Sequence, residues 1–368
     1  MSRANRVRVG VIGCGMVAQA EHLRNLLQLS DRFEISALAD PSATVREAMA
    51  ARYAVSRVYA QNEALLDAGN LDAVVVSAPA ATHAEVTLAA LDAGLHVFVE
   101  KPLCITLADA DRIVAARDRV QRVVQVGYMK RFDPAWERML AELPASTDDL
   151  RYIRVMCHDP EWVPIFAEGD IVKGADVAQD VIEATRRAES EQVEEAVGDG
   201  SPAAVFAFSD AYLGSMVHDV NVVHGLLERL GEPLPGRVVG AAWWNDGRAI
   251  TGSVQLTNGA RWDSAWIQLL DIREYQEQVA LYFRDSLRQL TFPSPWLQQS
   301  PTRYERSEAD SLDRSLRVYE SHREAFVQEL VHFHECVTAD ADCRTPPEQA
   351  RVDMELLTQM FLAGEPAP

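Results

Sequence analysis

The chain has 368 residues, of which 48% are hydrophobic and 24% charged, and a formal net charge of −20. This length predicts two domains or one large one with a sizeable core, and the negative charge argues against nucleic acid and anionic membranes, since both need a basic face on their partner. No apolar run approaches the roughly 20 residues of a membrane span, no signal-peptide core is visible, and five scattered cysteines favour a reduced, cytoplasmic setting.

Residues 1–126 alternate between short apolar runs and amphipathic stretches. Runs such as 74–76 and 97–99 are typical of strands buried on both faces, as in a parallel sheet. The fold class is therefore α/β, with a doubly wound Rossmann sheet over 1–126 whose ligands are expected at the carboxyl ends of its strands. The pattern predicts strands near 7–13, 33–39, 72–77, 97–100 and 123–126, and helices near 16–29, 42–53, 61–67, 82–93 and 105–119.

The stretch Val7–Ala18, VRVGVIGCGMVA, joins the first strand to a helix through the pattern G-x-G-x-x-A. Gly13 permits a tight turn, Gly15 lets the backbone approach a pyrophosphate, and Ala18 keeps the helix close to the sheet. The helix N-terminus offers unpaired N–H groups to the phosphates. A glycine turn that binds nothing is the alternative, but strand, turn, helix and a following acid all stand where a dinucleotide site needs them.

The following acid is Asp40, at the end of the second predicted strand. A carboxylate at this place can accept both hydroxyls of the adenosine ribose, and it repels the 2′-phosphate of NADP. The sequence therefore favours NAD over NADP as the cofactor. Arg46, one helical turn further on, is a cation and would favour NADP.

Later strand ends also carry informative residues. The strand predicted near 72–77 leads into a loop from Pro79 to His83, and the strand near 97–100 into Glu100-Lys101-Pro102. A charged pair directly after a buried strand is either a solvated salt bridge or a functional group. In the functional interpretation, the Lys101 ammonium projects into the nicotinamide site and holds the oxygen of a substrate alcohol or ketone.

Together these motifs resemble the glucose–fructose oxidoreductase/inositol dehydrogenase (Gfo/Idh/MocA) family. The matches are GCGMVA, ALAD at 37–40, the Pro79–His83 loop, EKP at 100–102 and GYMKRFDP at 127–134. The resemblance implies that Lys101 is catalytic, near C4 of the nicotinamide, and that the Lys101–Pro102 bond is cis. It implies these cofactor contacts: Gly13, Gly15, Met16, Val17, Asp40, Ala78, Pro79, His83, Glu100 and Lys101.

Residues 127–368 are predicted to form a substrate-binding and oligomerisation α+β domain with an open, mostly antiparallel sheet. An acidic helical insertion is expected at about 163–202, as a surface helix rather than a lid or subunit contact. The resemblance implies a homodimer or homotetramer. Strands are expected near 238–243, 251–256, 262–269, 276–283 and 286–290, then a long loop over 291–312 whose Arg303 and Tyr304 are possible substrate contacts, a helix over 318–337 and a last helix to about 362.

Family members typically carry D-x-x-x-H before the helix that ends near 230. Here His218-Asp219-Val220-Asn221 matches the histidine part, while Gly214 stands where the family has aspartate. The histidine is expected to act as general acid and base, and His224 is the alternative register. The substrate contacts that the resemblance implies are Lys101, Tyr128, Arg131, His218 and Asn221.

The expected function is hydride transfer between NAD and a secondary hydroxyl or ketone of a sugar, polyol or sugar derivative. A non-catalytic dinucleotide-binding sensor or corepressor of the same fold is the alternative, which Gly214 favours slightly. A metal site is not expected, because His332 and Cys336 could share a helical face but no second cluster completes a tetrahedral set.

Overall fold

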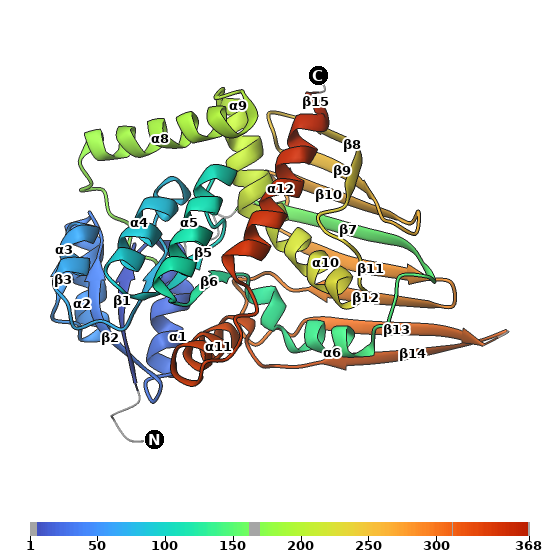
Figure 1. Cartoon of the computed structure of the whole chain (residues 1–368), viewed down its shortest axis with the longest axis horizontal. Coiled ribbons are helices and arrows are strands. Elements are labelled where there is room, and N and C mark those ends of the chain that lie inside the picture. The colour runs from blue at the N-terminus through green and yellow to red at the C-terminus, as the bar shows by residue number, and fades with distance from the viewer. Residues whose placement is uncertain (1–5, 162–169, 311, 367–368) are drawn as a thin grey trace. The chain divides into compact units, whose positions relative to one another are not determined.

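The computed structural model describes residues 6–161, 170–310 and 312–366. The chain forms two compact units, coloured by residue number in Figure 1. The first unit contains the N-terminal part of the chain and two segments from later in the sequence. The sequence-based division at residue 126 assigns both of these segments to the second domain. The first unit comprises Met1–Tyr128, Pro164–Glu195 and Phe326–Arg351, and the second comprises Met129–Val163, Ala196–Ala325 and Val352–Pro368.

The sheet of the first unit has six parallel strands in the order β3-β2-β1-β4-β5-β6, which confirms the predicted doubly wound architecture. Strand order reverses between β1 and β4, the place where such sheets bind their ligands. The apolar runs seen in the sequence form its middle strands, where every residue of β4 is buried. The strands are β1 (Val7–Ile12), β2 (Phe33–Ala39), β3 (Val58–Tyr59), β4 (Ala73–Val76), β5 (His96–Glu100) and β6 (Val124–Gly127).

Helices cover both faces of this sheet. A helix from the C-terminal third of the chain, α11 (Ala325–Ala339), packs Phe333 against Phe98 of β5, with ring centroids 5.8 Å apart. The predicted insertion helix forms as α8 (Gln179–Val197), whereas residues 163–169 of the insertion lie outside the described part. The other helices are η2 (Ala18–His22), α1 (Leu23–Gln28), α2 (Ala43–Tyr53), α3 (Asn62–Asp67), α4 (Ala80–Asp92) and α5 (Leu107–Val120).

The second unit is built on a nine-stranded sheet in the order β14-β13-β12-β11-β7-β10-β9-β8-β15. Most neighbours are antiparallel, as predicted, but β10 pairs with β7 and β15 with β8 in parallel. The strands are β7 (Leu150–Pro160), β8 (Arg237–Trp244), β9 (Ala249–Gln255), β10 (Arg261–Leu269), β11 (Gln276–Phe283), β12 (Ser286–Phe292), β13 (Arg303–Asp310), β14 (Asp313–Glu320) and β15 (Gly364–Pro366).

The loop predicted over 291–312 is too long, because β12 ends at Phe292 and β13 begins at Arg303. β13 pairs with β14 in a long hairpin, and α11 begins at Ala325 instead of near 318. All residues of β14 are exposed, so this strand shows no alternation of apolar and polar residues. The helices of the unit are η3 (Met129–Phe132), α6 (Pro134–Glu142), α9 (Pro202–Val205), η4 (Phe206–Met216), α10 (Val217–Arg229) and most of α12 (Pro347–Ala363).

All five cysteines are free thiols. Among the described residues, no helix is both long enough and apolar enough to cross a membrane.

Candidate functional site

The glycine turn after β1 has the geometry that its sequence predicts. Gly13 has a φ of +84°, and a Cβ there would lie 2.5 Å from the carbonyl oxygen of Ser77, so only glycine fits. Gly15 is exposed, and a Cβ there would have no atom within 4 Å. Met16 and Val17 are half-buried next to it. The turn therefore leaves open space at the start of a helix, which suits a phosphate group.

Asp40 ties this turn to the next helix. Its Oδ2 accepts a hydrogen bond from the Cys14 N–H at 2.8 Å, and its Oδ1 accepts one from the Ser42 N–H at 2.9 Å. A carboxylate has about four acceptor positions, so Asp40 retains the capacity to accept ribose hydroxyls. Arg46 donates to the carbonyl oxygens of Asp40 and Pro41 at 3.2 and 3.1 Å, so its guanidinium is held by the backbone.

His83 connects the loops that follow β4 and β5. The buried ring lies with Nε2 2.7 Å from the Ala78 carbonyl oxygen and Nδ1 2.7 Å from that of Pro102. Burial lowers the pKa of His83. Pro79, in contrast, is exposed. His83 thus holds the two loops in place at the edge of the sheet where the cofactor is expected.

Glu100 is buried beneath the candidate catalytic lysine. Its Oε1 lies 2.7 Å from His22 Nε2, and its Oε2 accepts from the Lys101 N–H at 3.1 Å. Burial raises the pKa of Glu100, but the hydrogen bond and charge of His22 and the charge of Lys101 outweigh it, so the net pKa lies below its ordinary value. Lys101 is half-buried, and the Lys101–Pro102 bond is cis, as the resemblance implied.

Residues 170–178, which we call the strap, return to this edge of the first unit. Val172 and the Gln19 carboxamide exchange two hydrogen bonds, at 2.9 and 3.0 Å. Further along the strap, Asp176 accepts from the Ser42 hydroxyl at 2.5 Å and from the Thr44 N–H at 3.0 Å. Sequence reasoning missed all of these contacts, because nothing local in the sequence marks Asp176 as a partner of α2.

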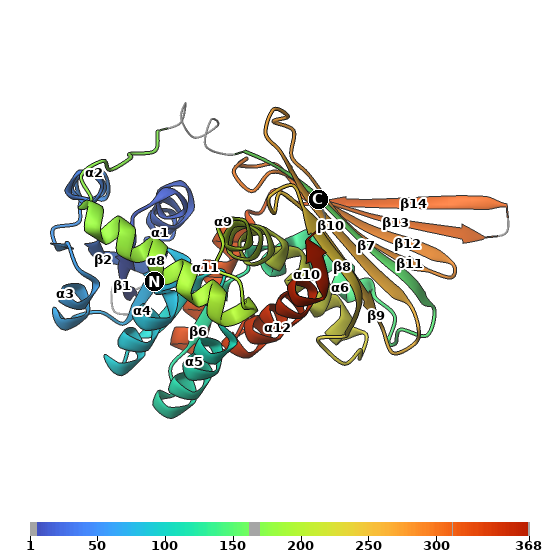
Figure 2. The ribbon, with the colours of Figure 1, turned by 90° about the horizontal axis from the view of Figure 1, so that it is seen from above.

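The strap leads into α8, which runs across the edge of the sheet above β1 and β2 (Figure 2). Gln192 on α8 donates to the carbonyl oxygen of Ala81, in the first turn of α4, at 2.9 Å. The insertion is therefore a docked element of the first unit at its nucleotide edge.

In the second unit, His218 lies half-buried on α10, and two of its neighbours along the helix are held by α12. Asp353 accepts from the Asn221 carboxamide at 2.7 Å, and its other oxygen lies 2.5 Å from His224 Nδ1. A Cβ at Gly214 would lie 3.0 Å from the Ser209 carbonyl oxygen, so the side chain common in the family has little room here.

A buried charged cluster that includes Asp219, the residue after His218, was not foreseen from the sequence. Lys130 forms an ion pair with Glu277, and Tyr275 donates to the same carboxylate. Burial and the Glu277 charge raise the pKa of Asp219 well above its ordinary value. The cluster offers a polar, desolvated environment on the unit that carries His218.

Arg131, expected to contact substrate, is 4% exposed. Its guanidinium donates to the Asn221 carbonyl oxygen at 3.2 Å and lies 4.8 Å from the Trp136 ring centre. A Cβ at Gly225 would lie 2.4 Å from Arg131 Cζ, so the two residues pack closely. Tyr128 is also buried, at 1% exposed.

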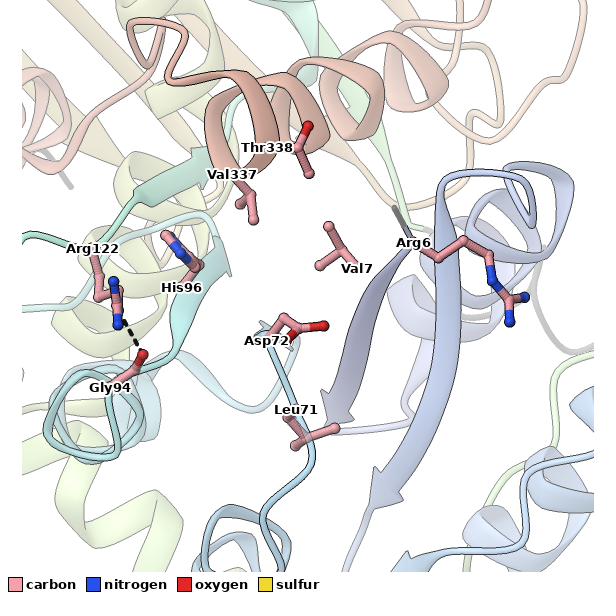
Figure 3. A pocket seen from close by; sticks show the side chains of 9 residues that line it. All are labelled: Arg6, Val7, Leu71, Asp72, Gly94, His96, Arg122, Val337 and Thr338. Carbon is pink, nitrogen blue, oxygen red and sulfur yellow. Dashed lines mark hydrogen bonds between the residues drawn. The ribbon is translucent and has the colours of Figure 1, made fainter. Parts of the chain in front are cut away.

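A cavity of about 420 Å³ opens at the opposite end of the first unit's sheet, where β1, β4 and β5 begin (Figure 3). Its charged groups have protein partners: Asp72 pairs with Arg8 at 2.6 Å, and Arg122 donates to the Gly94 carbonyl oxygen at 2.6 Å. The nucleotide turn lies at the other end of β1, so this cavity is separate from the candidate cofactor site. Among the described residues, no group of three or more histidine, cysteine or acidic side chains is placed to hold a metal ion.

Comparison with known proteins agrees with this geometry. Residues 7–128 match the profile described as "Oxidoreductase family, NAD-binding Rossmann fold" (GFO_IDH_MocA). The family match thus covers the N-terminal part of the first unit, from β1 to the end of β6. Inositol 2-dehydrogenase 3 of Saccharopolyspora erythraea is 42% identical over 134 residues, 36% of this chain and 39% of that protein. Myo-inositol 2-dehydrogenase of Thermotoga maritima is 30% identical over 199 residues, 53% of this chain and 58% of that protein.

The match to the first of these inositol dehydrogenases thus spans less than half of that relative's length. Solved structures extend the likeness of fold to the whole chain. A 3-ketoreductase from Actinomadura kijaniata, in complex with NADP and TDP-benzene, has a TM-score of 0.74 at 18% identity and covers 98% of this chain and 99% of its own. A UDP-N-acetylglucosamine 3-dehydrogenase from Acidithiobacillus ferrooxidans has a TM-score of 0.71 at 20% identity, covering 98% of each chain. The first unit is an NAD(P)-binding Rossmann unit, and the second shares the fold of these proteins.

Proposed function

We propose that this protein is an NAD-dependent dehydrogenase or ketoreductase that acts on a secondary hydroxyl or ketone of a sugar, polyol or sugar derivative. The observation that carries the proposal is the open turn at Gly15, with Asp40 behind it and Lys101 at the end of β5. The named activities of the inositol dehydrogenases and sugar-nucleotide enzymes above support the substrate class.

The turn at Gly13 and Gly15 would hold the pyrophosphate, and Asp40 the adenosine ribose. When bound, the nicotinamide exchanges a hydride with the substrate carbon. The Lys101 ammonium donates a hydrogen bond to the reacting oxygen and polarises it. His218 takes the hydroxyl proton in oxidation and returns it in reduction, since an imidazole with an ordinary pKa near 6.5 suits proton transfer at neutral pH.

In this proposal His83 and Glu100 position neighbouring parts of the protein. His83 holds the loops around Ala78 and Pro102, and Glu100 fixes the backbone of Lys101. In the second unit, Arg131 and Asn221 support α10, the helix that carries His218. NAD is proposed over NADP because Asp40 follows β2, where this fold is expected to receive the adenosine ribose, while the Arg46 guanidinium is held by backbone carbonyls.

The proposal is tested with purified protein, NAD or NADP, and a panel of inositols, hexoses, aminosugars and nucleotide-linked sugars, with absorbance followed at the NADH band. NADH formation with one substrate group is the expected result. NAD binding measured by calorimetry, without turnover on any substrate or ketosugar, would instead favour the sensor or corepressor function. Absence of nucleotide binding would contradict both.

A further inference from the structure

The strap places a carboxylate at the start of α2. Asp176 Oδ1 accepts from the Ser42 hydroxyl at 2.5 Å, and Oδ2 accepts from the Thr44 N–H at 3.0 Å. Ser42 is also the N-cap of α2, since its hydroxyl accepts from the Val45 N–H at 3.1 Å. A Cβ at Gly174 would lie 2.1 Å from the Ser42 hydroxyl oxygen, so the strap packs against the helix start without intervening space.

The donors that Asp176 uses are those that an anionic ligand would otherwise find. The first N–H groups of a helix and its positive end attract negative charge, and a hydroxyl adds a donor. The bonds from Ser42 and Thr44 lower the pKa of Asp176 to about 2, so the carboxylate is charged throughout the neutral range. The anion position at this helix start is thus filled by the protein's own side chain.

Asp40 accepts a hydrogen bond from the same residue, Ser42, as Asp176 does. Its Oδ1 accepts from the Ser42 N–H at 2.9 Å, while Asp176 takes the Ser42 hydroxyl. Two carboxylates therefore flank one residue at the place where the fold receives the adenosine ribose. The nearest cation on α2, Arg46, donates to the carbonyl oxygens of Asp40 and Pro41.

Building on the proposed function, we propose that Asp176 is a specificity-determining residue, which excludes the 2′-phosphate of NADP by occupying the donors at the start of α2 with a negative charge. NAD carries a hydroxyl at that ribose position. It therefore does not need these donors and is not repelled by the Asp176 carboxylate. The insertion thereby contributes to cofactor choice through a residue far from the nucleotide turn in sequence.

The test compares the dissociation constants of NAD, NADP and 2′,5′-ADP for the full chain by isothermal titration calorimetry. Asp176→Asn removes the charge and keeps the size of the side chain. We expect it to tighten NADP and 2′,5′-ADP binding by about tenfold relative to NAD, a size in keeping with one screened charge near a phosphate. The gain should shrink as salt is raised, because Asp176 is exposed.

Asp170→Asn is the matched control. Asp170 lies on the same strap, is 93% exposed at its side chain, and pairs with Arg52 near the other end of α2, so this variant changes net charge equally. It should leave the ratio of NADP to NAD affinity unchanged. If both variants shift the ratio equally, the effect is one of overall charge and the inference fails.

Two further outcomes separate this inference from the function on which it rests. If the wild-type chain binds neither nucleotide, the proposed function is overturned, and this inference with it. If NAD binds but Asp176→Asn weakens NAD and NADP alike, Asp176 only docks the strap and the inference alone is overturned. Thermal melts of the variants confirm that each is folded.

Discussion

His22 on η2 and Glu100 at the end of β5 form a buried pair with Nε2 and Oε1 2.7 Å apart. Their side chains are 0% and 8% exposed. The other Glu100 oxygen accepts the Lys101 N–H. A Cβ at Gly127 would lie 3.2 Å from the same carboxylate, so β6 also packs closely on it. The pair therefore links the first helix to the residue that we assign to catalysis.

Glu100→Gln is expected to lower the free energy of unfolding by about 1.5–3 kcal/mol, the range for losing a buried hydrogen bond to a charged group. The folded-state pKa of Glu100 lies below its ordinary value, so its stabilising contribution is present above pH 4.5 and is lost as pH falls through the folded-state pKa. Urea unfolding at pH 7 measures the change. Glu34→Gln, at a 46% exposed partner of Arg6, is the control and should cost less than about 1 kcal/mol.

Lys101→Ala should lower kcat by about 10²–10⁴-fold, the usual size of a positioned proton-transfer or polarising group. The dissociation constant of NAD should stay nearly unchanged, because the turn and Asp40 hold the nucleotide. Steady-state kinetics and calorimetry measure the two quantities. Lys173→Ala, at an exposed lysine of the strap, is the control for loss of one ammonium group. Full activity of Lys101→Ala would show that Lys101 has no catalytic role.

Glu329 on α11 gives a second stability prediction. Burial, with the charges of Glu100 and Glu21, raises the pKa of Glu329 well above its ordinary value, so the folded protein holds a proton there that the unfolded chain releases. The free energy of unfolding of the protein therefore falls as pH rises above about 4.5, by up to roughly 1.4 kcal/mol per pH unit, until the folded-state pKa of Glu329 is reached.

Glu329→Gln removes this titration while keeping the shape of the protonated acid. The variant should match the wild type near pH 4.5 and be increasingly more stable above it, which urea unfolding between pH 4.5 and 8 would show. Parallel stability curves for the two proteins would mean that Glu329 is ionised in the folded state.

Several of these residues could be predicted from the sequence and others could not. The turn at Gly13 and the cis bond at Lys101–Pro102 were predicted because local motifs carry them. Asp176 and Ser42 are 134 positions apart, and Lys130 and Glu277 are 147 apart. Contacts across such distances have no periodicity that one sequence reveals. The hairpin of β13 and β14 was missed for a different reason, since β14 is exposed along its length and buries no apolar face.

Cys336 has no role in the proposed mechanism, but the surroundings of its thiol predict its reactivity. A hydrogen bond with Cys343 and one with His332, whose Nε2 is 3.4 Å from Cys336 Sγ, lower its pKa to about 5, against the opposing effect of burial. Burial raises the pKa of Cys14 to about 12, so that thiol is uncharged at neutral pH. Because the thiolate is the nucleophile, Cys336 should be the more readily alkylated of the two.

Iodoacetamide labelling followed by peptide mass spectrometry across pH 4–9 should show the Cys336 rate levelling off above about pH 5–6. Cys343→Ala should move that midpoint upward, because it removes the hydrogen-bond donor that contributes most to the shift. Cys104→Ser, at a buried cysteine whose pKa is raised, should leave the midpoint where it is. A Cys336 rate that still climbs between pH 7 and 9 would show that this thiol titrates near its ordinary pKa and that the Cys343 contact does not stabilise a thiolate.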